Sequence, residues 1–256
     1  MSSLEIHMFP CLADNYGYLL HDADAEVTAA VDTPDADVIL RELDTKGWKL
    51  THILNTHHHP DHAGGNLALK RETGCTIVGP RADAQRIPGM DEGVGDGDVV
   101  ALGGHRAEVY DTPGHTRGHI VYFFRGDEVA FVGDTLFAIG CGRLFEGTPA
   151  QMWSSFGKIL RWPDATRIYC AHEYTQANAR FALTVEPKNA ALVERAAEVA
   201  RLRALGRPTI PTTLAAEKAT NPFLRAASRE LRENVGLSGA TDVEVFAKTR
   251  ALKDAF

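Results

Sequence analysis

Cysteine is scarce in this chain of 256 residues: there are four, Cys11, Cys75, Cys141 and Cys170, and none belongs to a C-x-x-C pair. The missing pairs argue against a zinc site built from thiolates and against a thioredoxin-type redox motif. We therefore expect the cysteines to be small buried apolar residues of a protein in a reducing compartment.

Basic clusters are also lacking. The formal net charge is −7, and no long run of Lys or Arg interrupts the acidic balance. Because such a surface repels a phosphate backbone, we expect no nucleic-acid partner, and the charge argues against a nuclease.

Long apolar runs are absent as well. No stretch approaches the roughly 18 apolar residues that a membrane span requires. The start, "MSSLEIHMFP", has neither a basic beginning nor a continuous apolar run, so it is not typical of a secretory signal. Apolar residues make up 44% of the chain and charged residues 24%, the balance of a globular protein. We expect a cytoplasmic monomer with no membrane partner.

Short β-type segments alternate with helical segments in the first two thirds of the chain. The expected strands include residues 25–32, 50–56, 75–80 and 167–170, and the expected helices cover residues 34–47, 65–74 and 149–162. Between residues 119 and 137, Arg125-Gly126-Asp127 separates two apolar runs, which predicts a hairpin. This alternation predicts a layered α/β domain.

Strand signals stop after about Thr175. Helical patterns follow over residues 188–206 and 241–256. The change predicts two domains, one over residues 1–172 and a helical one over residues 173–256.

Four histidines and an aspartate are crowded into "HHHPDH", directly after an apolar strand. In an extended chain residues i and i+2 point the same way, so His57 and His59 can grip one ion while His58 points elsewhere. A proline then bends the chain, and Asp61 and His62 can grip a second ion. A solvated polar run is the competing interpretation, and we favour it for His58 alone.

Three further candidates follow apolar strands: His115 after "AEVY", Asp134 after "VAFV" and His172 after "RIYC". Strand ends are where α/β sheets build their sites. A turn or capping role is an equal alternative for each alone, but five imidazoles and two carboxylates together suit two ions. A bridging aspartate would hold the ions roughly 3.5–4 Å apart. Donors without thiolate suit Zn²⁺, Fe or Mn²⁺.

The remaining histidines fit no ligand position, and we expect them to be structural. They are His7, His21, His52, His105 and His119.

The motifs "THHHPDH", "PGHTRGH", "GDTLF" and "AHEYT" resemble the metallo-β-lactamase superfamily. The segments "FPCLADNYGYLL", "CGRLFEGTPAQMW", "TNPFLR" and "TRALKD" are similar to one branch, glyoxalase II (hydroxyacylglutathione hydrolase). The resemblance covers essentially the whole chain. It implies an α/β fold, a four-layer αββα sandwich with a C-terminal α-helical domain that binds substrate.

The resemblance also implies a metal arrangement and a reaction. The first metal would be held by His57, His59 and His115, the second by Asp61, His62 and His172, with Asp134 bridging. Two divalent ions, Zn²⁺ before Fe or Mn²⁺, would carry a bridging hydroxide, which Asp61 could also orient. The substrate would be S-(2-hydroxyacyl)glutathione, typically S-D-lactoylglutathione, cleaved to glutathione and D-lactate in methylglyoxal detoxification.

Five residues match family positions that contact the substrate. Arg143 and the pair Arg250 and Lys253, which share a helix face, would bind the anionic glutathione; a solvated helix face is the alternative for the pair. Tyr174 would hydrogen-bond the ligand, with a core aromatic as the alternative. Phe145 replaces a tyrosine of some members, so a side-chain hydrogen bond there is lost.

Two other functions compete with hydrolysis. A persulfide dioxygenase of the same superfamily uses similar motifs around one iron, but it is expected to lack the helical domain that carries Arg250 and Lys253. A metal-binding protein without catalytic activity is the other alternative.

Overall fold

The computed structural model describes residues 3–256, and the chain divides into two compact units. Among the described residues, the N-terminal unit comprises residues 3–112 and Arg117–Gly133, and the C-terminal unit comprises Pro113–Thr116 and Asp134–Phe256. Residues 134–172 thus group with the C-terminal helices, whereas the sequence places the boundary at residue 172. The domain division at residue 172 stays a prediction.

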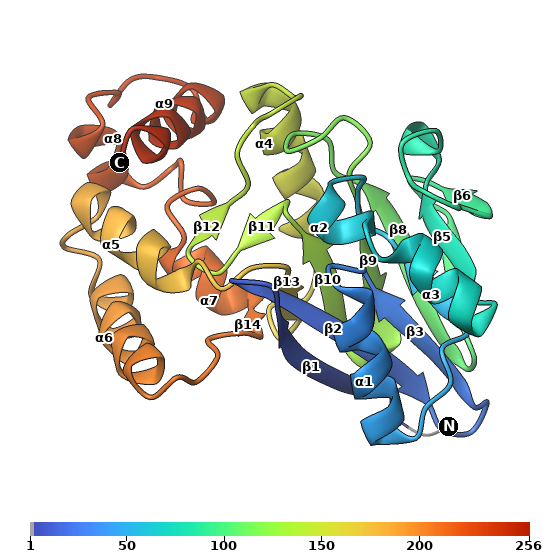
Figure 1. Ribbon diagram of the computed structural model, residues 1–256. Coiled ribbons are helices and arrows are strands. Elements are labelled where there is room, and N and C mark those ends of the chain that lie inside the picture. Colours follow the sequence, from blue (N-terminus) through green and yellow to red (C-terminus); the bar gives the residue numbers. More distant parts are fainter. Residues whose placement is uncertain (1–2) are drawn as a thin grey trace. The chain divides into compact units, whose positions relative to one another are not determined.

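Two sheets form the framework of the N-terminal unit (Figure 1). Strands β1 to β6 of the first sheet are Glu5–Cys11, Asn15–Asp22, Val27–Val31, His52–Leu54, Thr76–Pro80 and Glu92–Val94. The pairs β1–β2 and β2–β3 are antiparallel, and the neighbours from β3 to β6 are parallel. In the second sheet, β7 to β10 are successive antiparallel neighbours: Val99–Leu102, His105–Asp111, Ile120–Phe124 and Val129–Gly133.

Capping residues account for the limits of the longest helix of this unit. Helix α1 (Ala36–Lys46) begins after Asp35, whose side chain accepts from the Val38 amide, and ends at Gly47 with φ +68°. The other elements are α2 (Pro60–Ala63), α3 (Asn66–Thr73) and the short 3₁₀ turns Arg81–Asp83 and Arg125–Asp127. The helices expected over residues 34–47 and 65–74 are confirmed.

The first sheet has a different partner on each face. Leu19 and Ala30, paired across β2 and β3, pack in one buried cluster with Ile39 of α1. On the opposite face, the ring of Tyr18 lies 5.3 Å from that of Phe131 in the second sheet. The N-terminal unit is therefore layered as helix, sheet and sheet, which agrees with the α/β layering expected from the sequence.

The hairpin expected around Arg125-Gly126-Asp127 is confirmed. Strands β9 and β10 pair with Val129 opposite Phe124, and the three residues form the 3₁₀ turn between them. Glu128 closes the turn with φ +52°, in the left-handed region.

The C-terminal unit is mainly helical. Its elements are β11 (Leu136–Phe137), β12 (Gly140–Cys141), α4 (Pro149–Ile159), β13 (Arg167–Cys170), α5 (Thr175–Val185), α6 (Ala190–Ala204), β14 (Thr212–Thr213), α7 (Leu214–Thr220), α8 (Arg229–Asn234) and α9 (Asp242–Asp254). The helices expected over residues 149–162, 188–206 and 241–256 appear as α4, α6 and α9. The expectation that strands stop after Thr175 is wrong at β14, which pairs with β13. Two residues are too few to show a periodic pattern. Within residues 3–256 no helix is long and apolar enough to cross a membrane.

Candidate functional site

Successive side chains of the histidine run point to different sides, as expected for an extended chain. Nε2 of His57 lies 3.0 Å from Nδ1 of His59, whereas Nδ1 of His58 lies 3.1 Å from Oδ2 of Asp83. Two nitrogen ligands of a tetrahedral zinc ion stand about 3.3 Å apart, given bonds of about 2.05 Å. The spacing of His57 and His59 thus fits a shared ion, and His58 points elsewhere.

A second donor pair lies on helix α2, which begins at Pro60. Nε2 of His62 is 3.5 Å from Oδ2 of Asp61, and the side chain of Asn15 donates to the same oxygen at 3.2 Å. A carboxylate oxygen of Asp61 and an imidazole nitrogen of His62 are therefore close enough to bind the same metal ion.

Asp32 orients one histidine of each donor pair: His62 by direct contact and His57 through the Thr56 hydroxyl. Its Oδ2 lies 2.8 Å from Nδ1 of His62 and accepts from the Thr56 hydroxyl at 2.8 Å. The same hydroxyl lies 3.0 Å from Nδ1 of His57. Because each contact engages Nδ1, it orients the ring so that Nε2 is the nitrogen that can serve as a metal ligand. Asp32 was not predicted as a site residue; the available signal was an aspartate directly after the apolar strand "AEVTAAV".

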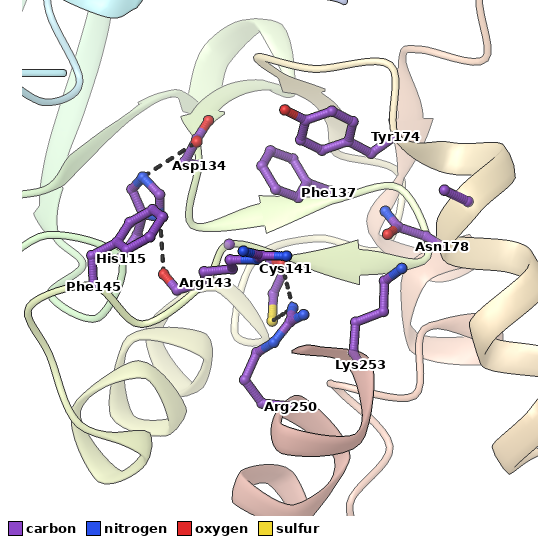
Figure 2. Close-up of a pocket in the computed structure, with 12 residues that line it drawn as sticks. His115, Asp134, Phe137, Cys141, Arg143, Phe145, Tyr174, Asn178, Arg250 and Lys253 are labelled. Carbon is purple, nitrogen blue, oxygen red and sulfur yellow. Dashed lines mark hydrogen bonds and ion pairs between the residues drawn. The ribbon is translucent and has the colours of Figure 1, made fainter. Parts of the chain in front are cut away.

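The C-terminal unit places a carboxylate between two imidazoles. Oδ2 of Asp134 lies 3.3 Å from Nε2 of His115, and Oδ1 lies 3.5 Å from Nε2 of His172. Nδ1 of His115 lies 2.9 Å from the Arg143 carbonyl oxygen, to which it can donate, so the ring is fixed with Nε2 toward Asp134 (Figure 2). A carboxylate whose two oxygens face different imidazoles has the geometry of a bridging ligand.

The two donor sets fit parts of a dinuclear metal site. Each offers imidazole and carboxylate atoms at ligand spacing, with the opposite ring nitrogen of His57, His62 and His115 engaged by the protein. Imidazole and carboxylate donors accommodate Zn²⁺, Fe and Mn²⁺ alike.

A pocket of about 390 Å³ opens beside His115 and Asp134 within the C-terminal unit (Figure 2). This volume lies in the range of small-molecule sites. Three cationic side chains line it, Arg143, Arg250 and Lys253. Their charge favours an anionic ligand.

The three cations are not equivalent. Arg250 is 5% exposed, and its Nη1 donates to the Cys141 carbonyl oxygen at 2.9 Å. Its Nη2 also lies 2.9 Å from a carboxylate oxygen of Asp254. Burial lowers the pKa of Lys253, and the neighbouring guanidinium groups lower it further. Arg143 is exposed and pairs loosely with Asp254 at 3.7 Å. Because the buried Arg250 guanidinium is already engaged by Cys141 and Asp254, Arg143 and Lys253 are better placed to contact a ligand.

Aromatic rings complete the pocket wall. The ring of Tyr174 stacks on that of His172, with centroids 4.7 Å apart, and meets Phe137 edge-on at 5.3 Å. Phe145 is 62% exposed and lies 5.2 Å from the His115 ring. Both aromatic residues predicted to bind substrate thus line the pocket.

Each histidine left as structural has a partner within the N-terminal unit. The partners of His7, His21, His52, His105 and His119 are Glu42, Thr28, Thr51, Asp127 and Thr112. His119 also stacks on His57 with centroids 4.7 Å apart, so it packs against a candidate ligand.

The cysteines are free and buried, as expected. Cys141 lines the pocket, where burial raises its pKa to about 11. At neutral pH its thiol is protonated, so it is a poor nucleophile, and covalent catalysis by this cysteine is disfavoured.

Comparisons with known proteins agree along the whole chain. A family model described as the metallo-beta-lactamase superfamily matches residues 21–172, and one described as the hydroxyacylglutathione hydrolase C-terminus matches residues 173–256. Proteins named hydroxyacylglutathione hydrolase from Maricaulis maris and Methylococcus capsulatus are 59% and 54% identical to the chain. The first alignment covers 100% of both chains and the second 99% of both.

Solved structures share the fold. The crystal structure of ETHE1 from Myxococcus xanthus is 25% identical, with a TM-score of 0.68 over 96% of this chain and 90% of that one. TTHA1623 in a di-iron-bound form is 22% identical, with a TM-score of 0.60 over 86% of this chain and 100% of that one. Together with the family models, they confirm the expected αββα sandwich with a C-terminal helical region. The chain belongs to the hydroxyacylglutathione hydrolase, or glyoxalase II, family of the metallo-β-lactamase superfamily.

Proposed function

We propose that this protein hydrolyses S-(2-hydroxyacyl)glutathione thioesters, with S-D-lactoylglutathione as its substrate in methylglyoxal detoxification. The products are glutathione and D-lactate. One observation carries the proposal: the pocket of the C-terminal unit holds His115 and Asp134 together with the cations Arg143, Arg250 and Lys253. A thioester attached to an anionic carrier needs this combination.

The proposed metal ligands are those that the family resemblance implies. His57, His59 and His115 would hold one ion, Asp61, His62 and His172 would hold the other, and Asp134 would bridge them. The 3.0 Å spacing of the His57 and His59 nitrogens and the two-sided contacts of Asp134 support this assignment. Zn²⁺ is the proposed metal. When bound, two such cations lower the pKa of a coordinated water to about 7 and polarise a carbonyl group.

The protein's own residues bind and orient the thioester. Arg143 and Lys253 hold the carboxylates of glutathione, and the Tyr174 hydroxyl donates a hydrogen bond to the ligand. Phe145 contributes only apolar surface, because it has no hydroxyl. The departing glutathione thiolate corresponds to a thiol of pKa ~8.5, so it leaves without a general acid from the protein.

The persulfide dioxygenase alternative is not favoured. Residues 173–256 match the hydroxyacylglutathione hydrolase C-terminus, and α9 of that segment carries both Arg250 and Lys253. This is the helical part that we expect such a dioxygenase to lack.

We also propose that the protein acts in the cytoplasm as a monomer. Four free, buried cysteines support a reducing compartment. Size-exclusion chromatography with light scattering will test the monomer directly.

The deciding experiment is hydrolysis of S-D-lactoylglutathione by native, metal-depleted and Zn²⁺-reconstituted protein, with elemental analysis of each sample. We expect two metal ions per chain, loss of turnover on depletion and recovery with Zn²⁺. Full activity in protein shown to be metal-free would overturn the metal mechanism. Oxygen uptake with glutathione persulfide, without thioester hydrolysis, would instead favour the dioxygenase. Bound metal without turnover of either substrate would indicate a non-catalytic metal-binding protein.

A further inference from the structure

A short hairpin forms one wall of the proposed substrate pocket. Strands β11 and β12 pair with Leu136 opposite Cys141, and the chain turns at Ala138 and Ile139. The hairpin follows Asp134 closely, and its residues Phe137 and Cys141 line the pocket (Figure 2). A two-stranded hairpin is at best marginally stable by itself. Its position must therefore be fixed by other parts of the unit.

Side chains from the C-terminal helices bind the backbone of this hairpin. Asn221 donates to the Phe137 and Gly140 carbonyl oxygens at 3.2 and 2.9 Å. Asn178 donates to the Ala138 carbonyl oxygen at 3.1 Å. The Cys141 carbonyl oxygen is the one that accepts from Arg250, and the Ile139 amide donates to Oε2 of Glu217 at 2.9 Å.

Ile139, at the tip of the hairpin, has a strained backbone. Its φ is +56°, a left-handed conformation that a β-branched residue rarely adopts. Its side chain is fully buried in a cluster with Ala182 and Leu192 of the helices. Strain of this kind persists only where the surroundings hold the residue firmly. The apolar cluster holds the Ile139 side chain, and the hydrogen bond to Glu217 holds its backbone amide.

Glu217 is fully buried and accepts hydrogen bonds with both oxygens. Oε2 accepts from the Ile139 amide and from the Asn221 side chain, each at 2.9 Å. Oε1 accepts from the Thr212 hydroxyl at 2.8 Å and from the guanidinium of Arg195. One carboxylate therefore links the hairpin tip, and the asparagine that binds its carbonyl groups, to β14 and α6.

We propose that Glu217 is a positioning residue for substrate binding, acting through the β11–β12 hairpin. It keeps the Phe137 and Cys141 wall in place although it does not line the pocket itself. The expected effect on substrate binding rests on the proposed thioesterase function, whereas the effect of Glu217 on the position of the hairpin does not.

The test is Glu217→Gln, which keeps the shape but removes the charge. A charge-assisted hydrogen bond is the stronger one, so the single amide oxygen will turn to Arg195. The amide nitrogen then faces the N–H of Ile139, and two donors oppose each other.

Glu186→Gln is the matched control. Glu186 is likewise fully buried, and it accepts from Arg225 at 3.0 Å and from Ser228 at 2.6 Å, away from the hairpin. Both variants lose a buried carboxylate beside a guanidinium, so both are expected to lower the melting temperature.

Two readouts separate positioning from general stability. We expect Glu217→Gln to raise KM for S-D-lactoylglutathione about tenfold with little change in kcat. A tenfold change corresponds to the free energy of one hydrogen bond to a charged group. Hydrogen exchange of the Ile139 amide should accelerate by at least about tenfold on the same reasoning. Glu186→Gln should leave both quantities at wild-type values.

Equal KM and equal Ile139 exchange in the two variants would overturn the proposal. If the wild-type protein hydrolyses no thioester, the proposed function fails, and hydrogen exchange still decides whether Glu217 holds the hairpin.

Discussion

Asp32 and His62 form a buried carboxylate–imidazole pair, with Oδ2 of Asp32 2.8 Å from Nδ1 of His62. Asp32 reaches this position with φ +56°, a left-handed conformation, and its other oxygen accepts from the Thr56 amide at 2.7 Å. The pair orients the His62 ring so that Nε2 is the nitrogen that would bind a metal.

Asp32→Asn is expected to weaken metal binding by about 10–100-fold, the usual effect of losing an outer-shell partner. The amide retains the shape of the side chain but loses the negative charge that holds His62. Competition with a chromogenic chelator will measure the metal affinity. Asp127→Asn is the control, because Asp127 pairs with His105 at 3.0 Å in the same unit but away from the candidate ligands. Equal metal affinity in the two variants would contradict the role of Asp32.

The depressed pKa of Lys253 predicts a pH-dependent KM. Burial is its main cause, and the surrounding charges are Arg250, Arg180 and Arg143, which add to it, and Asp254, which opposes it. A lysine with a lowered pKa loses its proton at a lower pH than an ordinary lysine. We therefore expect KM to be lowest near neutral pH and to rise through the alkaline range before the ordinary lysine pKa of about 10.4.

Two variants of Lys253 check this assignment. Lys253→Arg keeps its charge throughout, since the guanidinium pKa exceeds about 12, so the alkaline rise in KM should disappear. Lys253→Met should raise KM roughly tenfold near neutral pH, because a charge-assisted contact is lost. Initial rates corrected for spontaneous hydrolysis supply KM at each pH. An unchanged alkaline rise in Lys253→Arg would show that another group titrates.

Gly142 leaves no room for a side chain. An added Cβ would lie 2.1 Å from the Asp134 carbonyl oxygen and 2.9 Å from Nδ1 of His115. Gly142→Ala must displace one of these groups, so we expect a loss of about 1–3 kcal/mol in stability. Turnover should fall on the order of a hundredfold, because reacting groups are misplaced.

Gly157, in the middle of α4, is the contrasting position. An added Cβ there meets nothing within 4 Å. Gly157→Ala should therefore stabilise the protein by roughly 0.5–1 kcal/mol through helix propensity and leave turnover unchanged. Denaturant unfolding and steady-state kinetics on the two variants give the comparison. Similar effects at both positions would contradict the steric argument.

Local patterns in the sequence were sufficient for much of the fold. Helix α1 follows from its apolar spacing, its aspartate cap and the glycine that ends it, all within residues 34–47. The assignment of His57 and His59 to one side, and His58 to the other, follows from the alternation of side chains along an extended chain. These features depend on neighbours along the chain, so the chain's own geometry determines them.

Other features were decided by the tertiary structure. Asp32 and Glu217 look like an ordinary strand end and an ordinary helical residue in the sequence, and only folding brings them to His62 and Ile139. Helices α5, α7 and α8 and the β11–β12 hairpin were likewise not predicted.

The reason is physical. A two-residue strand and a buried carboxylate carry no periodic signal, and their stability comes from hydrogen bonds to residues 24–78 positions away in the chain. The sequence by itself determined the donor types, their local facing and the family. Tertiary packing decided which groups hold those donors in place, because long-range contacts select the partners of buried polar atoms.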